Sequence, residues 1–303
     1  MSYSFLKESK LYIVYGGNKY RIYTTTAISF SQTFAEDSYS VKTLHDQSKM
    51  FEGSTITKAN AANFSFGVPL TTEKDESIVI TLLSDITDGQ LKSFDIYVQT
   101  GSSTFKIENA IITNSNFSFS AKKQFFVEIS GQGTKLTRAG NESYTIPGNA
   151  QSESATRTPL TIYPVVTIDS LNMSSIVKAQ VSITTEISWT KYDNLHQSLS
   201  VTNSSNAMFP STYTIGKRIA SGAITQYQTD NNITQFDDFN TSSNLTLKAV
   251  ETGKASNDSG FFQLQLNPIS YTARMAVADV YTQNYDFTST DNTAISTRIT
   301  QYS

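Results

Sequence analysis

The sequence offers few side chains of the kinds that carry out catalysis or bind a metal. Its two histidines, His45 and His196, lie in polar stretches without a suitably spaced carboxylate, and the chain contains no cysteine. A zinc site needs three or four His, Cys or carboxylate ligands that converge on one point. We therefore predict no metal site, because a loop histidine in such a setting is ordinarily a solvated surface residue.

The motifs of nucleotide-binding proteins and hydrolases are incomplete as well. Gly131-Gln-Gly133 lacks the third glycine of a dinucleotide site, and Gly216-Lys217 lacks the earlier glycine and the following Ser or Thr of a phosphate loop. Asp237 and Asp238 are adjacent carboxylates, but they fall on a short segment where we expect them to face solvent. We predict no catalytic residue, no cofactor-binding residue and no enzymatic activity.

The composition favours β-strands. Ser and Thr fill more than a quarter of the 303 residues, charged residues make up 16%, and Tyr (16) and Phe (18) far outnumber the single Trp. Thr, Tyr and Phe suit a pleated, half-buried surface, whereas long helices favour Ala, Leu, Glu and Lys. The net charge of −3 gives no basic patch with which to grip nucleic-acid phosphates.

Alternation of apolar and polar residues recurs along the chain and predicts half-buried strands. The clearest cases are residues 11–15, 20–23, 94–98, 116–120, 177–187, 245–250 and 261–266, with a hairpin turn at 100–104. Two short segments, 75–84 and 231–239, favour a helix. The first of these is equally compatible with a strand, because all four residues from Ile78 to Thr81 are β-branched.

Internal similarity at a shift of 158 or 159 residues predicts a tandem duplication. Three matches share this shift and occur in the same order: residues 28–30 with 187–189, 62–66 with 220–224, and 109–111 with 267–269. We therefore predict two tandem domains of β-sandwich or β-barrel type, each with one short helix. The expected bounds are 1–145 for the first domain, 146–162 for a linker rich in Gly, Asn and Ser, and 163–303 for the second domain.

Each predicted copy has a long polar stretch at the same point, residues 33–57 in the first and 191–212 in the second. Connections of this length are usually functional or disordered. We expect both to be loops that contact another copy of the chain. Their candidate contact residues are Phe34, Glu36, Asp37, Tyr39, His45, Met50, Phe51, Tyr192, His196, Met208 and Phe209.

Several segments together resemble the siphophage tail tube proteins (major tail proteins) with a duplicated tube domain, of the coliphage T-five type. The segments are 27–32, 61–70, 94–98, 107–112 and 125–134 in the first half, followed in the same order by 179–189, 213–227, 245–250 and 265–288. The resemblance implies homotrimeric, pseudo-hexameric rings that stack into a hollow tube, through which phage DNA passes without sequence-specific binding. It also implies contact with the tape measure, terminator and tail-tip proteins.

The same resemblance places the protein in the virion tail, assembled in the host cytoplasm. The charged start of the chain lacks the apolar segment of a secretory signal, and no apolar run is long enough for a membrane anchor. Two alternatives remain at this stage. One is a tail-tip hub or terminator ring, and the other is a monomeric β-sandwich binding module.

Overall fold

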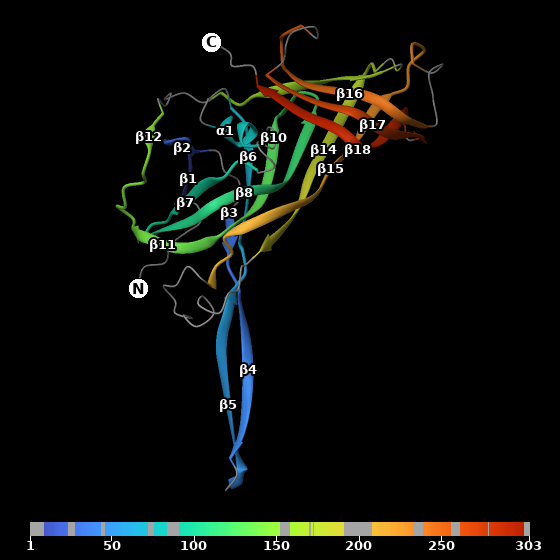
Figure 1. Cartoon of the computed structure of the whole chain (residues 1–303). Coiled ribbons are helices and arrows are strands. Elements are labelled where there is room, and N and C mark those ends of the chain that lie inside the picture. The colour runs from blue at the N-terminus through green and yellow to red at the C-terminus, as the bar shows by residue number, and fades with distance from the viewer. Residues whose placement is uncertain are drawn as a thin grey trace.

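The structure is a computed structural model of the chain. It describes residues 9–23, 28–43, 46–71, 76–83, 91–151, 158–169, 171, 173–190, 208–232, 239–255, 261–277 and 279–299. These residues form a mainly β protein with one short helix, as the sequence predicts. A large curled sheet makes up the body, and a long two-stranded hairpin projects from it (Figure 1).

The elements follow one another in two series. The first contains β1 (Lys10–Tyr15), β2 (Asn18–Ile22), β3 (Ile28–Ser31), β4 (Phe34–Thr43), β5 (Asp46–Ala59), β6 (Ala62–Pro69), α1 (Ile78–Thr81), β7 (Phe94–Gln99), β8 (Ser103–Ser120), β9 (Lys123–Gln124), β10 (Phe126–Gly133), β11 (Lys135–Asn141) and β12 (Asn149–Ala150). The second contains β13 (Thr161–Ile168), β14 (Ile176–Thr190), β15 (Thr212–Tyr227), β16 (Phe239–Glu251), β17 (Phe262–Val277) and β18 (Tyr281–Ile299).

Both series build the same antiparallel arrangement. The pairing order β1-β7-β8-β10-β6-β3 in the first half is repeated as β13-β16-β17-β18-β15-β14 in the second. The two matching orders support the predicted duplication. We call each set of six strands a module, and the two modules together the body.

Strand registers show which residues correspond between the modules. Phe66 lies opposite Ile129 in the first module, and Ile224 lies opposite Tyr285 in the second. If residues 62–66 match 220–224 as predicted, Phe66 corresponds to Ile224 and Ile129 corresponds to Tyr285. The other internal match, 109–111 with 267–269, falls on β8 and β17, which occupy the same place in their modules. The predicted match of 28–30 with 187–189 does not fit this correspondence, in which Ile28, opposite Phe66, corresponds to Ala179, opposite Ile224.

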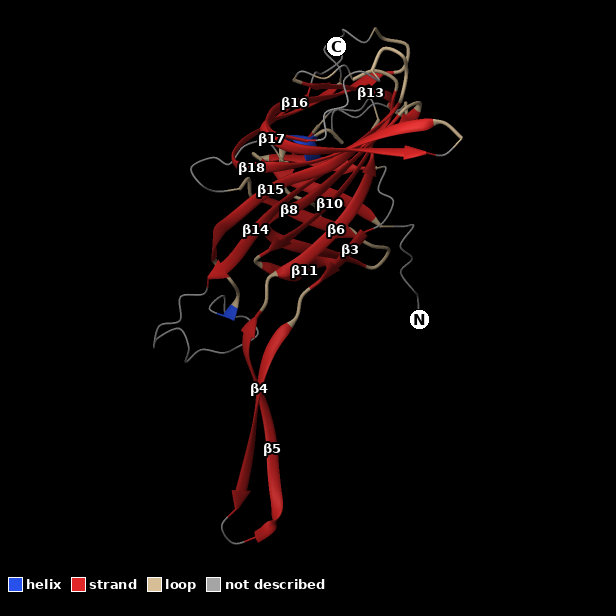
Figure 2. Cartoon of the chain, turned by 90° about the vertical axis from the view of Figure 1, so that its right-hand side faces the viewer, coloured by secondary structure: helices blue, strands red, loops and turns tan. Residues whose placement is uncertain are grey.

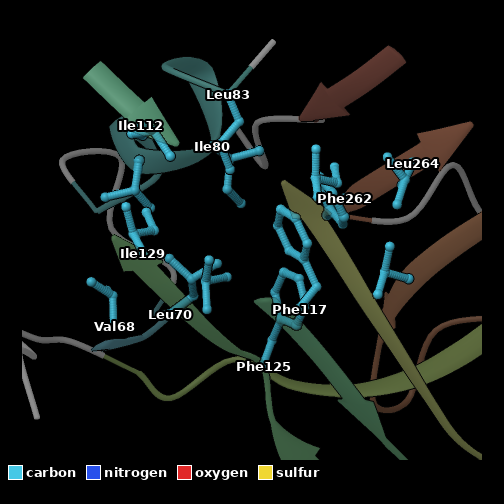
Figure 3. Packing of buried hydrophobic residues seen from close by; sticks show 14 of the residues in the cluster. Val68, Leu70, Ile80, Leu83, Ile112, Phe117, Phe125, Ile129, Phe262 and Leu264 are labelled. Carbon is cyan, nitrogen blue, oxygen red and sulfur yellow. The ribbon is translucent and has the colours of Figure 1, made fainter. Parts of the chain in front are cut away.

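A single hydrophobic core runs through both modules. Phe117 of β8 and Phe125, which follows β9, pack against Phe262 of β17, with ring centroids 5.2 and 5.5 Å apart (Figure 3). All three side chains are fully buried. Aromatic pairs of this kind add about 0.5–1.5 kcal/mol each beyond their buried area. The ring cluster therefore holds the two halves of the chain together.

The predicted helix at 75–84 is present as α1, and it is only four residues long. Ile78, Val79 and Ile80 are all buried, so the helix is held by packing rather than by capping, and no side chain caps its N-terminus. Of the second predicted helix, residues 233–238 lie outside the described residues. Phe239 opens strand β16 instead.

Residues 33–57 differ from the expectation of an irregular loop. They form most of the β4–β5 hairpin, whose strands are paired from Phe34–Ala59 out to Thr43–Asp46. Aromatic and β-branched residues, which favour strands, supply eight of the 24 residues of β4 and β5. Polar residues interrupt the apolar–polar alternation from which strands are recognised in a sequence.

Candidate assembly surfaces

The β4–β5 hairpin leaves the body at one end (Figures 1 and 2). Among the described strands, β4 and β5 pair only with each other, so they form a separate two-stranded sheet. The ten residues of β4 give this hairpin a length of about 34 Å at the usual rise of a strand. A lone two-stranded hairpin is at best marginally stable in water. Its far end therefore has a geometry suited to contact with another molecule.

The base of the hairpin packs against the end of the second long polar stretch. Met208 and Phe209 are buried with Ala59 in a small cluster, and Ile56 packs against it. The Phe34 ring meets the Phe209 ring edge to face, with centroids 6.5 Å apart. The structure thus brings together three of the predicted contact residues, Phe34, Met208 and Phe209, from stretches far apart in the sequence.

The other predicted contact residues are spread along the hairpin or lie outside the described residues. Glu36, Asp37 and Tyr39 are on β4, whereas Met50 and Phe51 are on β5, opposite Lys42 and Val41. Glu36 is exposed. His45, Tyr192 and His196 lie outside the described residues. The hairpin therefore carries at least five of the predicted residues away from the body.

A polar network beside the hairpin base was not predicted. The Trp189 Nε1 donates a hydrogen bond to Gln132 Oε1 at 2.8 Å, and Gln132 Nε2 donates to Asn63 Oδ1 at 3.1 Å. Trp189 and Tyr213 pack edge to face at 5.1 Å between ring centroids. Since Asn63 and Gln132 belong to the first module and Trp189 to the second, the network fixes one module against the other.

Tyr213 extends this network to residue 91. The Leu91 backbone N–H donates to the Tyr213 hydroxyl at 2.8 Å, and the hydroxyl donates back to the Leu91 carbonyl at 3.3 Å. Burial raises the pKa of Tyr213 above its ordinary value, although the backbone bond at Leu91 partly offsets this. The phenol is therefore neutral at physiological pH and acts as a structural link. The sequence signal was the single Trp, which alone could not identify its partner.

The modules are joined edge to edge. Strand β14, at the end of the second pairing order, pairs antiparallel with residues 114–120 of β8 in the first module. Ala179 lies opposite Phe119, and Val181 lies opposite Phe117. All four side chains are buried, with exposed fractions between 0 and 2%. An unpaired strand edge exposes backbone N–H and C=O groups, and this junction satisfies such groups on both modules.

Several large exposed apolar side chains lie on neighbouring strands of the second module. Met275 is 46% exposed and Val277 70% exposed at the end of β17. Neighbouring exposed residues are Val280 and Tyr281, at the start of β18, and Tyr227 and Phe239, at the end of β15 and the start of β16. In the described part of the chain, residues 273–277 of β17 pair with β18 on one side only. We call this set the β17 edge.

Charged groups in the described residues form structural pairs. Lys106 Nζ lies 3.1 Å from Asp95 Oδ2 and 3.3 Å from Glu108 Oε1, above the buried ring of Tyr97. Burial disfavours the charged form of Lys106, but the hydrogen bond and charge of Asp95, with Tyr97 and Glu108, raise its pKa above the ordinary value. Another ion pair joins Arg274 and Asp286.

The described residues contain no group of three or more His, Cys, Asp or Glu side chains placed to bind a metal. In the same residues, no helix has the length and apolar character needed to cross a membrane.

The chain matches a known protein family over nearly its whole length. The model of the bacteriophage baseplate tube protein family matches residues 1–300. No curated protein matches the chain. The match supports a tail tube of a phage, whereas the finer resemblance to siphophage tail tube proteins stays a prediction. Because the match spans nearly the whole chain, the protein belongs to the bacteriophage baseplate tube protein family and is a structural component of the phage virion tail.

Proposed function

We propose that copies of this chain close into rings, and that the rings stack into a hollow tube through which phage DNA leaves the virion. Three chains of two similar modules give a ring of six modules, so a homotrimer is the proposed ring. The family supplies the tube role. The observation that carries the stacking step is the β4–β5 hairpin, which projects from the body and pairs only with itself among the described strands.

The proposed partner of the hairpin is the adjacent ring. A hairpin of this length that lies free would expose two strand edges to water, and exposed edges are prone to unspecific pairing. Docking on the neighbouring ring gives those edges a partner, and the ordering entropy is then offset only in the assembled tube. Tyr39, Met50 and Phe51 lie on the outer part of the hairpin and are the proposed contact residues.

The lumen is proposed to conduct DNA without binding it tightly. The chain carries 23 Lys and Arg against 26 Asp and Glu, so its overall charge does not favour strong phosphate binding. A wall rich in Lys and Arg would hold DNA through counterion release.

The tape measure, terminator and tail-tip proteins are the other proposed partners, because the length of a tube must be set and both of its ends must be capped. Assembly is proposed to take place in the host cytoplasm.

A second candidate is a ring at the baseplate that does not extend into a long tube, as a hub or terminator ring would behave. The family description favours this candidate, because it names the baseplate. A monomeric binding module has no such support.

Shortening the hairpin tests the proposal. Asp37 and Thr55 lie opposite each other, so replacing residues 38–54 with Asn-Gly closes a two-residue turn of a favoured type. We expect the full chain to form stacked rings in negative-stain micrographs, and the shortened chain to form single rings with an unchanged melting temperature of the body. Tubes of unchanged length from the shortened chain would contradict the stacking role. Single rings from the full chain would favour the second candidate, and single globules would exclude both.

A further inference from the structure

The β8–β14 junction inside the chain has corresponding strand edges elsewhere in the body. These are the outer edge of β3 and the β17 edge, and neither has a second partner strand among the described residues. The correspondence between the modules can be fixed at one pair of residues. Gly131 of β10 lies opposite Phe64 of β6, and Gly222 of β15 lies opposite Phe287 of β18. In both pairs an aromatic ring lies over the glycine, where a Cβ atom would be only 2.5 or 2.6 Å from the ring. The same packing contact therefore recurs with the two residue types exchanged.

This correspondence identifies the strands of each module that match the two strands of the inner junction. Strand β14 corresponds to β3, because Ala179 lies opposite Ile224 as Ile28 lies opposite Phe66. Strand β17 corresponds to β8, because Ala273 lies opposite Tyr285 as Ser115 lies opposite Ile129.

The counterparts of the buried junction residues are exposed. Counting along the strands from these pairs, Phe117 and Phe119 of β8 correspond to Met275 and Val277 of β17. The first two are 1% and 0% exposed, whereas the last two are 46% and 70% exposed. On the other strand, Ala179 and Val181 are buried, but their counterparts Ile28 and Phe30 are only half-buried. The edges of β8 and β14 bury each other's side chains, whereas the corresponding edges of β17 and β3 leave theirs exposed or half-buried.

We infer that β3 of one copy pairs antiparallel with the β17 edge of the next copy, with Ile28 opposite Val277 and Phe30 opposite Met275. The occupant is a second copy of this chain, because the chain already shows this contact between its own modules. The inference rests on the proposed ring, and it supplies the contact that closes it. Ser29 then lies opposite Ala276, and Ser31 lies opposite Arg274.

The contact has the symmetry that a ring needs. It is heterologous, since different edges of the two copies meet, and such a contact closes a ring when its rotation divides the circle evenly. The inner junction rotates one module relative to the other, and the outer junction repeats the same step between chains. Modules would then follow one another around the ring at equal angles. Junctions within one chain would alternate with junctions between two chains.

Disulfide trapping tests the register directly, because the chain has no native cysteine. The variant carrying Ser29→Cys and Ala276→Cys places both thiols at exposed positions that the inferred pairing sets opposite each other. Directly opposite strand residues have Cα atoms about 4.5–5.5 Å apart, which lies within the range that a disulfide requires. The matched control is Ser29→Cys with Met275→Cys, whose side chains point to opposite faces of the shared sheet.

The readout is denaturing gel electrophoresis after mild oxidation of preparations in which micrographs show rings. We expect at least about tenfold more cross-linked chains in the first variant than in the control, as disulfide geometry is strict. Equal cross-linking in both variants, or none in either while rings are present, would overturn the inferred pairing and leave the tube role intact. Absence of rings from the unsubstituted protein at every concentration would overturn the proposed function and this contact together.

Discussion

Phe117 and Met275 occupy corresponding positions in the two modules. Truncating each of them to alanine separates an effect on the stability of the single chain from an effect on assembly between chains. Phe117 is 1% exposed and packs against Phe262, whereas Met275 is 46% exposed on the β17 edge. The Phe117→Ala change leaves a cavity in the core, and such changes cost about 3–5 kcal/mol. At about 2–4 °C per kcal/mol for a chain of this size, the expected fall in melting temperature is on the order of 10 °C.

The Met275→Ala change affects an exposed side chain, so it should alter the stability of the single chain by no more than about 0.5 kcal/mol. Pairing with a second copy would bury roughly 50 Å² more of this side chain, which amounts to about 1.3 kcal/mol at 25 cal/mol per Å². That free energy corresponds to an increase of about tenfold in the concentration at which rings form.

Two measurements check the pair of changes. Circular dichroism at a concentration where sedimentation shows single chains gives the melting temperature, and light scattering against concentration gives the onset of assembly. The reasoning fails if Met275→Ala lowers the melting temperature of the single chain as far as Phe117→Ala does. It also fails if Met275→Ala leaves the onset of assembly unchanged, since the β17 edge would then not be an interface.

Three further predictions concern the stability of the body and the hairpin base. Gly131→Ala should lower the free energy of unfolding, measured by urea denaturation, by about 3 kcal/mol, because its Cβ would lie 2.1 Å from the Ile111 carbonyl oxygen. Gly216→Ala is the control and should leave that free energy unchanged, because no atom lies nearer than 3.6 Å to its Cβ. Met208→Ala should cost about 2–3 kcal/mol locally and speed amide hydrogen exchange in β4 and β5, with exchange in β16 unchanged as the control. Lys106→Gln should cost about 1 kcal/mol at neutral pH. Because the pKa of Lys106 is raised in the folded chain, this difference is fully present below about pH 10.4 and is lost as the pH rises further; the exposed Lys217→Gln is its control.

Several strands of the body were predicted because their side chains alternate between core and solvent. Strand β16 shows this in the predicted segment 245–250, where Leu245, Leu247 and Ala249 are buried. The segment of α1 was compatible with a helix or a strand, because Ile78, Val79 and Ile80 are apolar but β-branched. Periodicity identifies an element where one face of that element is buried.

Two features escaped sequence analysis for physical reasons. The sequence of the β4–β5 hairpin has many polar residues and no sustained alternation of apolar and polar types that would indicate two long strands. The junction between β8 and β14 depends on the register of strands far apart in the sequence. Phe117 and Phe119 alternate with serine and asparagine as any half-buried strand does. Their role as a junction becomes visible only when β14 is seen beside them.

The two junctions differ in whether they lie within one chain or between chains, and this difference bears on how assembly is controlled. The inner junction joins seven residue pairs between β14 and β8, and the described part of β3 offers four residues to a neighbouring chain. The inferred outer junction joins separate chains, so its formation would depend on concentration, whereas the inner junction forms within one chain. At low concentration such a contact would leave chains single until a second contact adds to it. The proposed docking of the hairpin on a neighbouring ring would provide such a contact, so closure of a ring and its stacking on the next would be favoured together rather than in sequence.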